Sequence, residues 1–152
     1  MSTVAKLRHL SFDEWLALAI AAKELLLARI RFATVPAGRI VNRLKDALQD
    51  GVDAPGSCNA ARVSWAINAV APRVPWRADC LIRAMAADRW LRRGGEHPQF
   101  FIGVAKDGEA FRAHAWLRCH GVMVTGGDGA EYTELVTPAG PTVFHQREDG
   151  AS

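Results

Sequence analysis

The chain has 152 residues, of which 49% are hydrophobic and 23% are charged, and its formal net charge is +3. We expect one folded domain of ordinary size, since this composition excludes wholesale disorder, a collagen-like repeat and a disulfide-rich miniprotein. Residues 1–100 hold 15 Lys or Arg against nine Asp or Glu, whereas residues 101–152 hold four against seven. The arginines are scattered at helical spacing rather than gathered with aromatic residues in a dense stripe, so we expect no nucleic-acid partner.

Neither an export signal nor a membrane span is expected. Residues 1–10 are not followed by an apolar segment with a small-residue cleavage site. The most apolar stretch, residues 15–30, is interrupted by Lys23 and Glu24 and is too short to cross a membrane. The cysteines form no C-x-x-C pair, which favours a reducing, cytoplasmic location and argues against a structural zinc site. They are Cys58, Cys80 and Cys119.

Helical signals begin the chain. Ser11 and Glu14 form a capping box, which predicts a helix from there to about residue 30. After a break at residues 32–38, a second amphipathic helix is predicted over residues 39–48.

Two more helices are predicted before the pattern changes. Ser57 can cap a third helix over residues 58–71, which Pro72 ends. A fourth helix should start within residues 77–80 and stop at the glycine pair 94–95.

The hydrophobic period then changes to that of strands. We predict three strands joined by two turns; the strands are 99–104, 111–119 and 122–125, and the turns are 106–108 and 120–121. Helices followed by an antiparallel meander indicate an α+β fold and argue against a doubly wound parallel sheet.

Cys80 is placed to act as a nucleophile. It opens the fourth helix between Arg77 and Arg83, where exposed backbone amides and the helix dipole favour a thiolate. The alternative is a buried small hydrophobic residue, because free cysteine is among the most buried residue types.

His114 lies in the middle of the second strand, on the same face as Trp116. The apolar residues of the opposite face, which we expect to meet the main core, are Phe111, Ala113, Ala115 and Leu117. His114 should then point away from that set, where the Cys80 helix or the amino-terminal helices could cover it. A half-exposed strand histidine is the alternative. However, a cysteine at a helix start followed by a strand histidine is the arrangement of a thiol nucleophile and its base.

A third residue would orient the imidazole by accepting its second N–H. Asp128, in the glycine-rich stretch 126–129, fits this role, with Glu131 and Glu134 as substitutes. The alternative for Asp128 is an ordinary turn aspartate.

His120 is expected to be a hairpin-turn residue. Cys119, His120 and Cys80 could together attract a metal ion, but they lack a fourth ligand. We therefore expect no metal and no organic cofactor.

Several segments closely resemble the transglutaminase-like leader peptidases of lasso-peptide biosynthesis. Their order and the 34-residue spacing from Cys80 to His114 are specific together, and the resemblance covers about residues 20–136. The segments are Pro75-Trp76-Arg77-Ala78-Asp79-Cys80-Leu81, Leu91-Arg92-Arg93-Gly94-Gly95, Phe101-Ile102-Gly103-Val104 and Phe111-Arg112-Ala113-His114-Ala115-Trp116-Leu117.

The resemblance implies a papain-like cysteine protease fold and a Cys-His-Asp triad. Such an enzyme cuts the leader from a ribosomally synthesised precursor peptide, which frees the core peptide for a separate macrolactam synthetase. This chain resembles the stand-alone protease half, which works with a small leader-recognition protein, the RiPP recognition element. The expected organisation is a single domain over residues 1–152, with a helical amino-terminal region (1–57), a catalytic core (58–143) and a polar tail (144–152).

By resemblance, Cys80 is the nucleophile and His114 the base. Many relatives place the acid nearer the end of the third strand, where this chain has Thr125 or Gly126. The third role therefore lies between Asp128, a glutamate, and a Cys-His dyad with no acid.

Two other classes of function remain open at this stage. One is another acyl-transfer enzyme with the same triad, such as a transglutaminase or an arylamine acetyltransferase. The other is a catalytically silent peptide-binding module that has kept the fold.

Overall fold

The computed structural model describes residues 10–36, 39, 59–108, 110–127, 132–137 and 140–141. The helix predicted over residues 39–48, the cap at Ser57 and the polar tail lie outside this described part. The helices are α2 (Phe12–Thr34), α4 (Asn59–Val70), η1 (Ala71–Arg73) and α5 (Cys80–Arg93). The strands are β1 (Gln99–Asp107), β2 (Ala110–Cys119), β3 (Val122–Thr125), β4 (Thr133–Thr137) and β5 (Gly140–Pro141).

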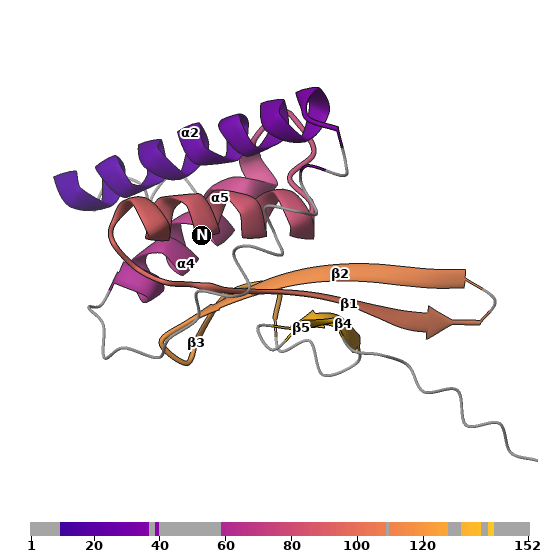
Figure 1. Ribbon diagram of the computed structural model, residues 1–152. Helices are drawn as coiled ribbons and strands as arrows, with labels where there is room; N and C mark the ends of the chain where they lie inside the picture. Colours follow the sequence, from indigo (N-terminus) through magenta and orange to yellow (C-terminus); the bar gives the residue numbers. More distant parts are fainter. Residues whose placement is uncertain are drawn as a thin grey trace, which may run out of the picture.

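The helices α2, α4 and α5 pack together on one side of the sheet (Figure 1). The strands have the order β3-β2-β1-β4-β5, and every neighbouring pair is antiparallel. The predicted α+β class is confirmed. The three predicted strands are present, whereas β4 and β5 were not predicted, and β4 pairs with β1 on the edge away from β2.

Local signals set the helix ends. The backbone N–H of Ser11 donates to the Glu14 carboxylate over 2.7 Å, and the Ser11 hydroxyl accepts from the backbone N–H of Glu14, so the predicted capping box is present. Helix α2 continues to Thr34, beyond the predicted end near residue 30, because no proline intervenes before Pro36. Helix α5 ends at Gly94, as predicted.

The β1–β2 hairpin is longer than predicted. Its register runs without interruption from the pair Gln99 and Arg118 to the pair Asp107 and Ala110, so β1 includes residues that were assigned to a turn. The turn between β2 and β3 is as predicted: His120 and Gly121 both have positive φ, 49° and 75°, as a tight hairpin turn requires.

Small residues bring the helices close to the sheet. Ala84 and Ala87 of α5 are fully buried in one core with Ala115 and Leu117 of β2. Alanine at these positions lets the helix backbone approach the strand closely, because it projects only a methyl group. Helix α5 is thereby held directly over β2.

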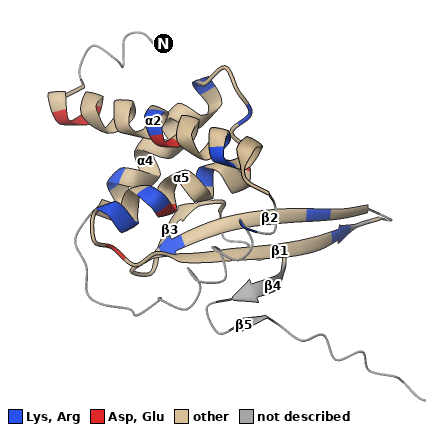
Figure 2. Cartoon of the chain, turned by 45° about the horizontal axis from the view of Figure 1, so that its top comes forward, with Lys and Arg blue, Asp and Glu red and all other residues tan. Residues whose placement is uncertain are grey.

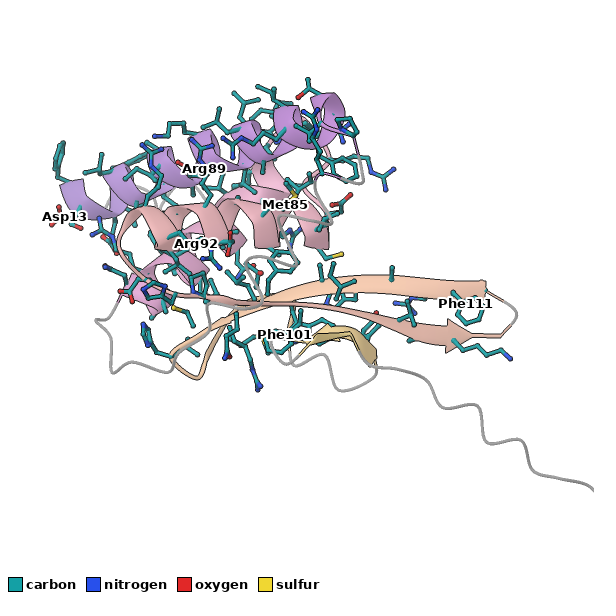
Figure 3. The ribbon with its side chains drawn as sticks, viewed as in Figure 1. Asp13, Met85, Arg89, Arg92, Phe101 and Phe111 are labelled. Carbon is teal, nitrogen blue, oxygen red and sulfur yellow. The ribbon has the colours of Figure 1, made fainter. Side chains whose placement is uncertain are left out.

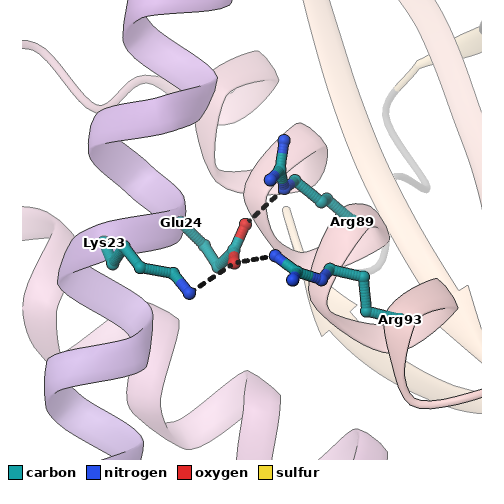
Figure 4. Close-up of polar contacts among 4 residues, drawn as sticks. All are labelled: Lys23, Glu24, Arg89 and Arg93. Carbon is teal, nitrogen blue, oxygen red and sulfur yellow. Dashed lines mark ion pairs between the residues drawn. The ribbon is translucent and has the colours of Figure 1, made fainter.

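A buried carboxylate joins α2 to α5 (Figure 4). Glu24 of α2 is only 2% exposed, and its carboxylate lies 2.9 Å from Arg89 Nε and 3.6 Å from Arg93 Nη1, both on α5. Lys23 approaches the same carboxylate at 3.6 Å. The Arg89 N–H does not point squarely at the carboxylate, so the contact is an ion pair rather than an aligned hydrogen bond.

Charged side chains are distributed over much of the described surface. Figure 2 shows Lys and Arg on the helices and on the β1–β2 hairpin, with Asp and Glu interspersed on the helices. In the part of the chain that the structure describes, no helix is both long enough and apolar enough to span a bilayer.

Candidate functional site

Cys80 occupies the first position of α5, as predicted. The carboxylate of Asp79 caps the helix by accepting the backbone N–H of Ile82 over 3.2 Å. At this first position, the backbone N–H of Cys80 itself has no partner within the helix and points out of the helix end. Cys80 is partly exposed, and it also packs against the hydrophobic core.

The segment before Cys80 is held by Arg83. Its Nε donates to the carbonyl oxygen of Ala78 over 2.7 Å, while Arg77 is exposed. Arg83 therefore fixes the entry to the helix, in addition to supplying positive charge nearby. The indole N–H of Trp76 is buried in this segment and has no hydrogen-bond partner among the described residues.

The imidazole of His114 is fixed by a backbone group. Its Nε2 lies 2.5 Å from the carbonyl oxygen of Gly126. A carbonyl oxygen can only accept, so Nε2 carries the hydrogen and Nδ1 is left with the lone pair of a base. Gly126 is one of the two residues, with Thr125, at which the resemblance described above would place the acid.

Only glycine fits at position 126. Its φ is +92°, and a Cβ atom there would lie 2.6 Å from the Cβ of Trp116 and 2.7 Å from the carbonyl oxygen of Ala115. The close approach of the Gly126 backbone to β2 is what brings its carbonyl to His114.

Aromatic rings surround His114. The ring of Tyr132 stacks on the imidazole with centroids 4.7 Å apart, and Trp116 lies on it at 5.9 Å. Trp116 in turn stacks on Phe101 at 5.6 Å. These rings restrict the imidazole orientation that the Gly126 carbonyl selects.

The predicted faces of β2 need a correction. Ala115 and Leu117 do face the core under the helices, but Phe111 is 73% exposed and Ala113 is also exposed. The reason is that the β1–β2 hairpin extends past the helices, with Phe111 near its far end (Figure 3).

The cover expected over His114 is also different. Figure 3 places Phe101 on the side of the sheet away from the helices, and the stacked rings place Trp116 and His114 with it. Residues of the sheet and Tyr132 therefore flank His114, rather than the Cys80 helix or the amino-terminal helices.

Cys80 and His114 belong to different layers: Cys80 begins α5, which packs on one face of the sheet, whereas His114 lies with the stacked rings on the other face. Helix α5 has 14 residues, or about 20 Å, and from Met85 to Arg92 it runs opposite to β1 (Figure 3). The thiol and the imidazole make no hydrogen bond with each other.

The segment directly after β3 approaches β2 beside the imidazole. Pairing between β2 and β3 ends at Leu117 and Thr125, so within the described residues β3 does not cover β2 at His114. The Gly126 carbonyl directly after β3 holds the imidazole there.

The predicted third member is not among the described residues. Asp128 and Glu131 lie outside them, and for Glu134 the structure describes the backbone, in β4, but not the side chain. The hydrogen-bond acceptor that sequence reasoning missed is the Gly126 carbonyl, a backbone group that has no side-chain signature.

A separate cluster lies at the other end of β2. His120 Nε2 is 2.6 Å from the carboxylate of Glu96, and the Cys119 thiol is beside them. Burial, and secondarily the charge of Glu96, raise the pKa of this thiol to about 11. From the sequence, Cys80 was the companion considered for Cys119 and His120, and no metal was expected; the structure brings Glu96 to them instead.

Comparison with known proteins assigns the family. Residues 22–137, about three quarters of the chain, match the family model of the transglutaminase-like superfamily. The chain therefore belongs to that superfamily, and the matched range includes Cys80, His114 and Gly126. No curated protein and no solved structure matches the chain.

Proposed function

We propose that the protein is a cysteine endopeptidase that removes the leader peptide from a lasso-peptide precursor. The observation that carries the proposal is the tautomer of His114: the Gly126 carbonyl leaves Nδ1 available as a base, and Cys80 at the start of α5 is partly exposed. Membership of the transglutaminase-like superfamily supports thiol-based acyl-transfer chemistry. The motifs around Cys80 and His114 favour the leader-peptidase branch.

In the proposed reaction, His114 Nδ1 takes the proton of the Cys80 thiol. The thiolate attacks the scissile carbonyl, and collapse of the tetrahedral intermediate breaks the C–N bond as Nδ1–H gives its proton to the leaving amine. Water, deprotonated by the same Nδ1, then hydrolyses the thioester and restores the thiol. The hydrogen on His114 Nε2 stays on that nitrogen throughout and is donated to the Gly126 carbonyl oxygen.

The helix start contributes to charge stabilisation. The outward-pointing N–H of Cys80 is suited to donate to the oxyanion, where the positive end of the helix dipole also acts. We propose that substrate binding brings the thiol and the imidazole within hydrogen-bond reach of each other, because catalytic hydrogen bonds often form fully only in the complex.

Asp128 remains our proposed third member. It follows the Gly126 carbonyl by two residues, so a carboxylate there could add negative charge near the same Nε2–H. The carbonyl already selects the tautomer, so Asp128 would strengthen the pair rather than define it.

A partner is proposed to supply specificity, because a small cleft reads only a few residues of a precursor. One face of α2 supports this proposal: most of its exposed side chains at helical spacing are apolar, with Phe12 82% exposed, and Lys23 interrupts them between Ala19 and Leu26. This α2 stripe consists of Phe12, Trp15, Leu16, Ala19, Leu26 and Ile30. We propose it as the docking surface for a small leader-recognition protein in a cytoplasmic pathway that also includes a macrolactam synthetase.

The test is incubation of the purified protein with the precursor, with and without the leader-recognition protein, followed by mass spectrometry. We expect a leader carboxylate and a free core amine, and no product with Cys80→Ala. Cleavage by Cys80→Ala within tenfold of the parent would overturn the mechanism.

The same experiment separates the other acyl-transfer enzymes. An added primary amine should not appear in the product of a protease. A leader–amine adduct in place of the free acid would identify an acyltransferase, and binding of the precursor without any cleavage would identify a silent module.

A further inference from the structure

Glu96, Cys119 and His120 bring three different metal-binding groups together away from the candidate active site. One carboxylate oxygen, the Cys119 sulfur and one ring nitrogen all lie within 4.8 Å of one another. Within the residues that the structure describes, no other three such side chains meet this way. The cluster lies five or more residues along β2 from His114, so it is a separate place in the fold.

The local backbone holds the cluster together. The β1–β2 register pairs Gln99 with Arg118, so its continuation brings the residues before β1 beside those after β2. Glu96 is directed there by the turn that follows α5, in which its N–H donates to the carbonyl oxygen of Leu91 over 3.0 Å. His120 is held by the positive φ of the hairpin turn.

The mixture of donors selects among metal ions. Mg²⁺ and Ca²⁺ prefer all-oxygen sites, whereas sulfur, nitrogen and a single carboxylate are typical ligands of Zn²⁺. Three protein ligands with a water at the fourth position form an open tetrahedral site. From the sequence, the absence of a fourth protein ligand argued against a metal ion. An open site does not need that ligand, because water takes the fourth position.

The distances fit this ion after a small adjustment. Ligands of tetrahedral zinc lie about 3.3–3.6 Å apart, so the atoms within 4.8 Å must close slightly, and the 2.6 Å contact of His120 with Glu96 must open by about 0.7 Å. Cys119 is 1% exposed and Glu96 is also buried, whereas part of the His120 side chain reaches solvent. The ion and its water can therefore enter past the turn.

We propose that Glu96, Cys119 and His120 bind one zinc ion. The ion replaces the His120–Glu96 hydrogen bond and joins the connection after α5 to the β2–β3 turn. Its binding does not depend on Cys80, His114 or peptidase activity.

The test uses the full chain carrying Cys80→Ala, so that the candidate nucleophile cannot bind the metal. Co²⁺ serves as a spectroscopic probe and Zn²⁺ as its competitor. We expect one Co²⁺ per chain with a thiolate-to-cobalt charge-transfer band, displacement of Co²⁺ by Zn²⁺, and a higher unfolding temperature with either ion.

His120→Asn is the most informative variant. Asn-Gly favours the same hairpin turn, so the variant should fold while lacking the imidazole. We expect its Zn²⁺ affinity to fall by more than the ~10–100-fold that changes outside the ligand shell typically cause. Glu96→Gln should weaken binding similarly, and Cys119→Ser should abolish the charge-transfer band.

His97→Gln, next to Glu96 but exposed, and Cys58→Ser are the matched controls and should bind as the parent does. Absence of saturable binding would overturn the proposal. So would a charge-transfer band that survives Cys119→Ser, or an affinity unchanged in His120→Asn.

Discussion

The Gly126 carbonyl takes the position at which an acidic side chain would be expected to hold the imidazole. Gly126→Ala would force a Cβ atom to 2.6 Å from Trp116 at a φ of +92°, so the backbone must move and the carbonyl must leave His114 Nε2. We expect the single-turnover cleavage rate to fall by about a hundredfold or more, since misorientation of a base is costly.

Gly127→Ala is the matched control for this prediction. Position 127 also has positive φ, +70°, but a Cβ there meets nothing within 4 Å. The control should lose about 1–2 kcal/mol of stability and retain its cleavage rate within about threefold. Equal rate losses in the two variants would attribute the effect to backbone strain alone.

Asp128→Asn tests the proposed acid. Because the Gly126 carbonyl keeps the hydrogen on Nε2, the amide cannot impose the wrong tautomer as it does in serine triads. We expect turnover to fall by about tenfold, at the low end of the effects seen for triad acids.

Glu131→Gln and Glu134→Gln should each change the rate by less than about threefold. A parental rate in Asp128→Asn with one crippled glutamate variant would reassign the role; parental rates in all three would leave a Cys80–His114 dyad.

Alkylation should distinguish the two described thiols. Burial raises the pKa of Cys119 to about 11, so at neutral pH its thiol stays protonated as well as inaccessible. We expect iodoacetamide at pH 7 to modify Cys80 first and Cys119 only on unfolding, as followed by peptide mapping. Comparable labelling rates in the native protein would contradict this assignment.

At the scale of elements, the position of α5 depends on its ion pairs with α2. Glu24→Gln would leave Arg89 partly buried without its counter-charge. We expect the free energy of unfolding in urea to fall by about 2 kcal/mol, below the ~3–5 kcal/mol of fully buried pairs because Arg93 is 59% exposed.

Asp13→Asn removes an exposed acid from the first turn of the same helix and should cost under about 1 kcal/mol. A loss no larger in Glu24→Gln than in Asp13→Asn would mean that the buried ion pairs add little to stability.

The elements with local signals were predictable from the sequence. The capping box at Ser11, the start of α5 at Cys80, its glycine stop and the His120-Gly121 turn each depend on neighbouring residues, and all four are present. Strand β4 was missed because its five residues gain their role from pairing with β1, about 30 residues earlier.

The site was predictable only in part, for physical reasons. The elements that carry Cys80 and His114 follow from the sequence motifs and from the signal for the helix start. The cover over a strand does not, because it depends on how far the hairpin extends beyond the helices. At position 126 the functional group is a backbone carbonyl, which has no side-chain signature in the sequence. Glu96 could have been found by extending the β1–β2 register past Gln99.

At the scale of the whole molecule, the α2 stripe should govern partnership rather than chemistry. Leu16→Ser and Leu26→Ser should lower the rate gain produced by the leader-recognition protein. Each change replaces an exposed leucine by a polar serine and so removes apolar surface from the proposed interface. The rate without partner should be unchanged. Trp65→Ser, an exposed aromatic on α4, is the control and should keep the gain. An undiminished gain in the α2 variants would refute docking on this stripe.

The far end of the β1–β2 hairpin also bears on how the protein behaves at high concentration. Among the described residues, β4 pairs with β1 only as far as Val104 and β3 pairs with β2 only from Leu117, so the end is a two-stranded ribbon with unpaired backbone groups on both edges. Such edges are templates for aggregation, and the exposed Phe111 adds an apolar contact. Lys106, its cross-strand partner, and Asp107 place charges of both signs at this end, and charged residues on an exposed strand edge discourage pairing with a second copy.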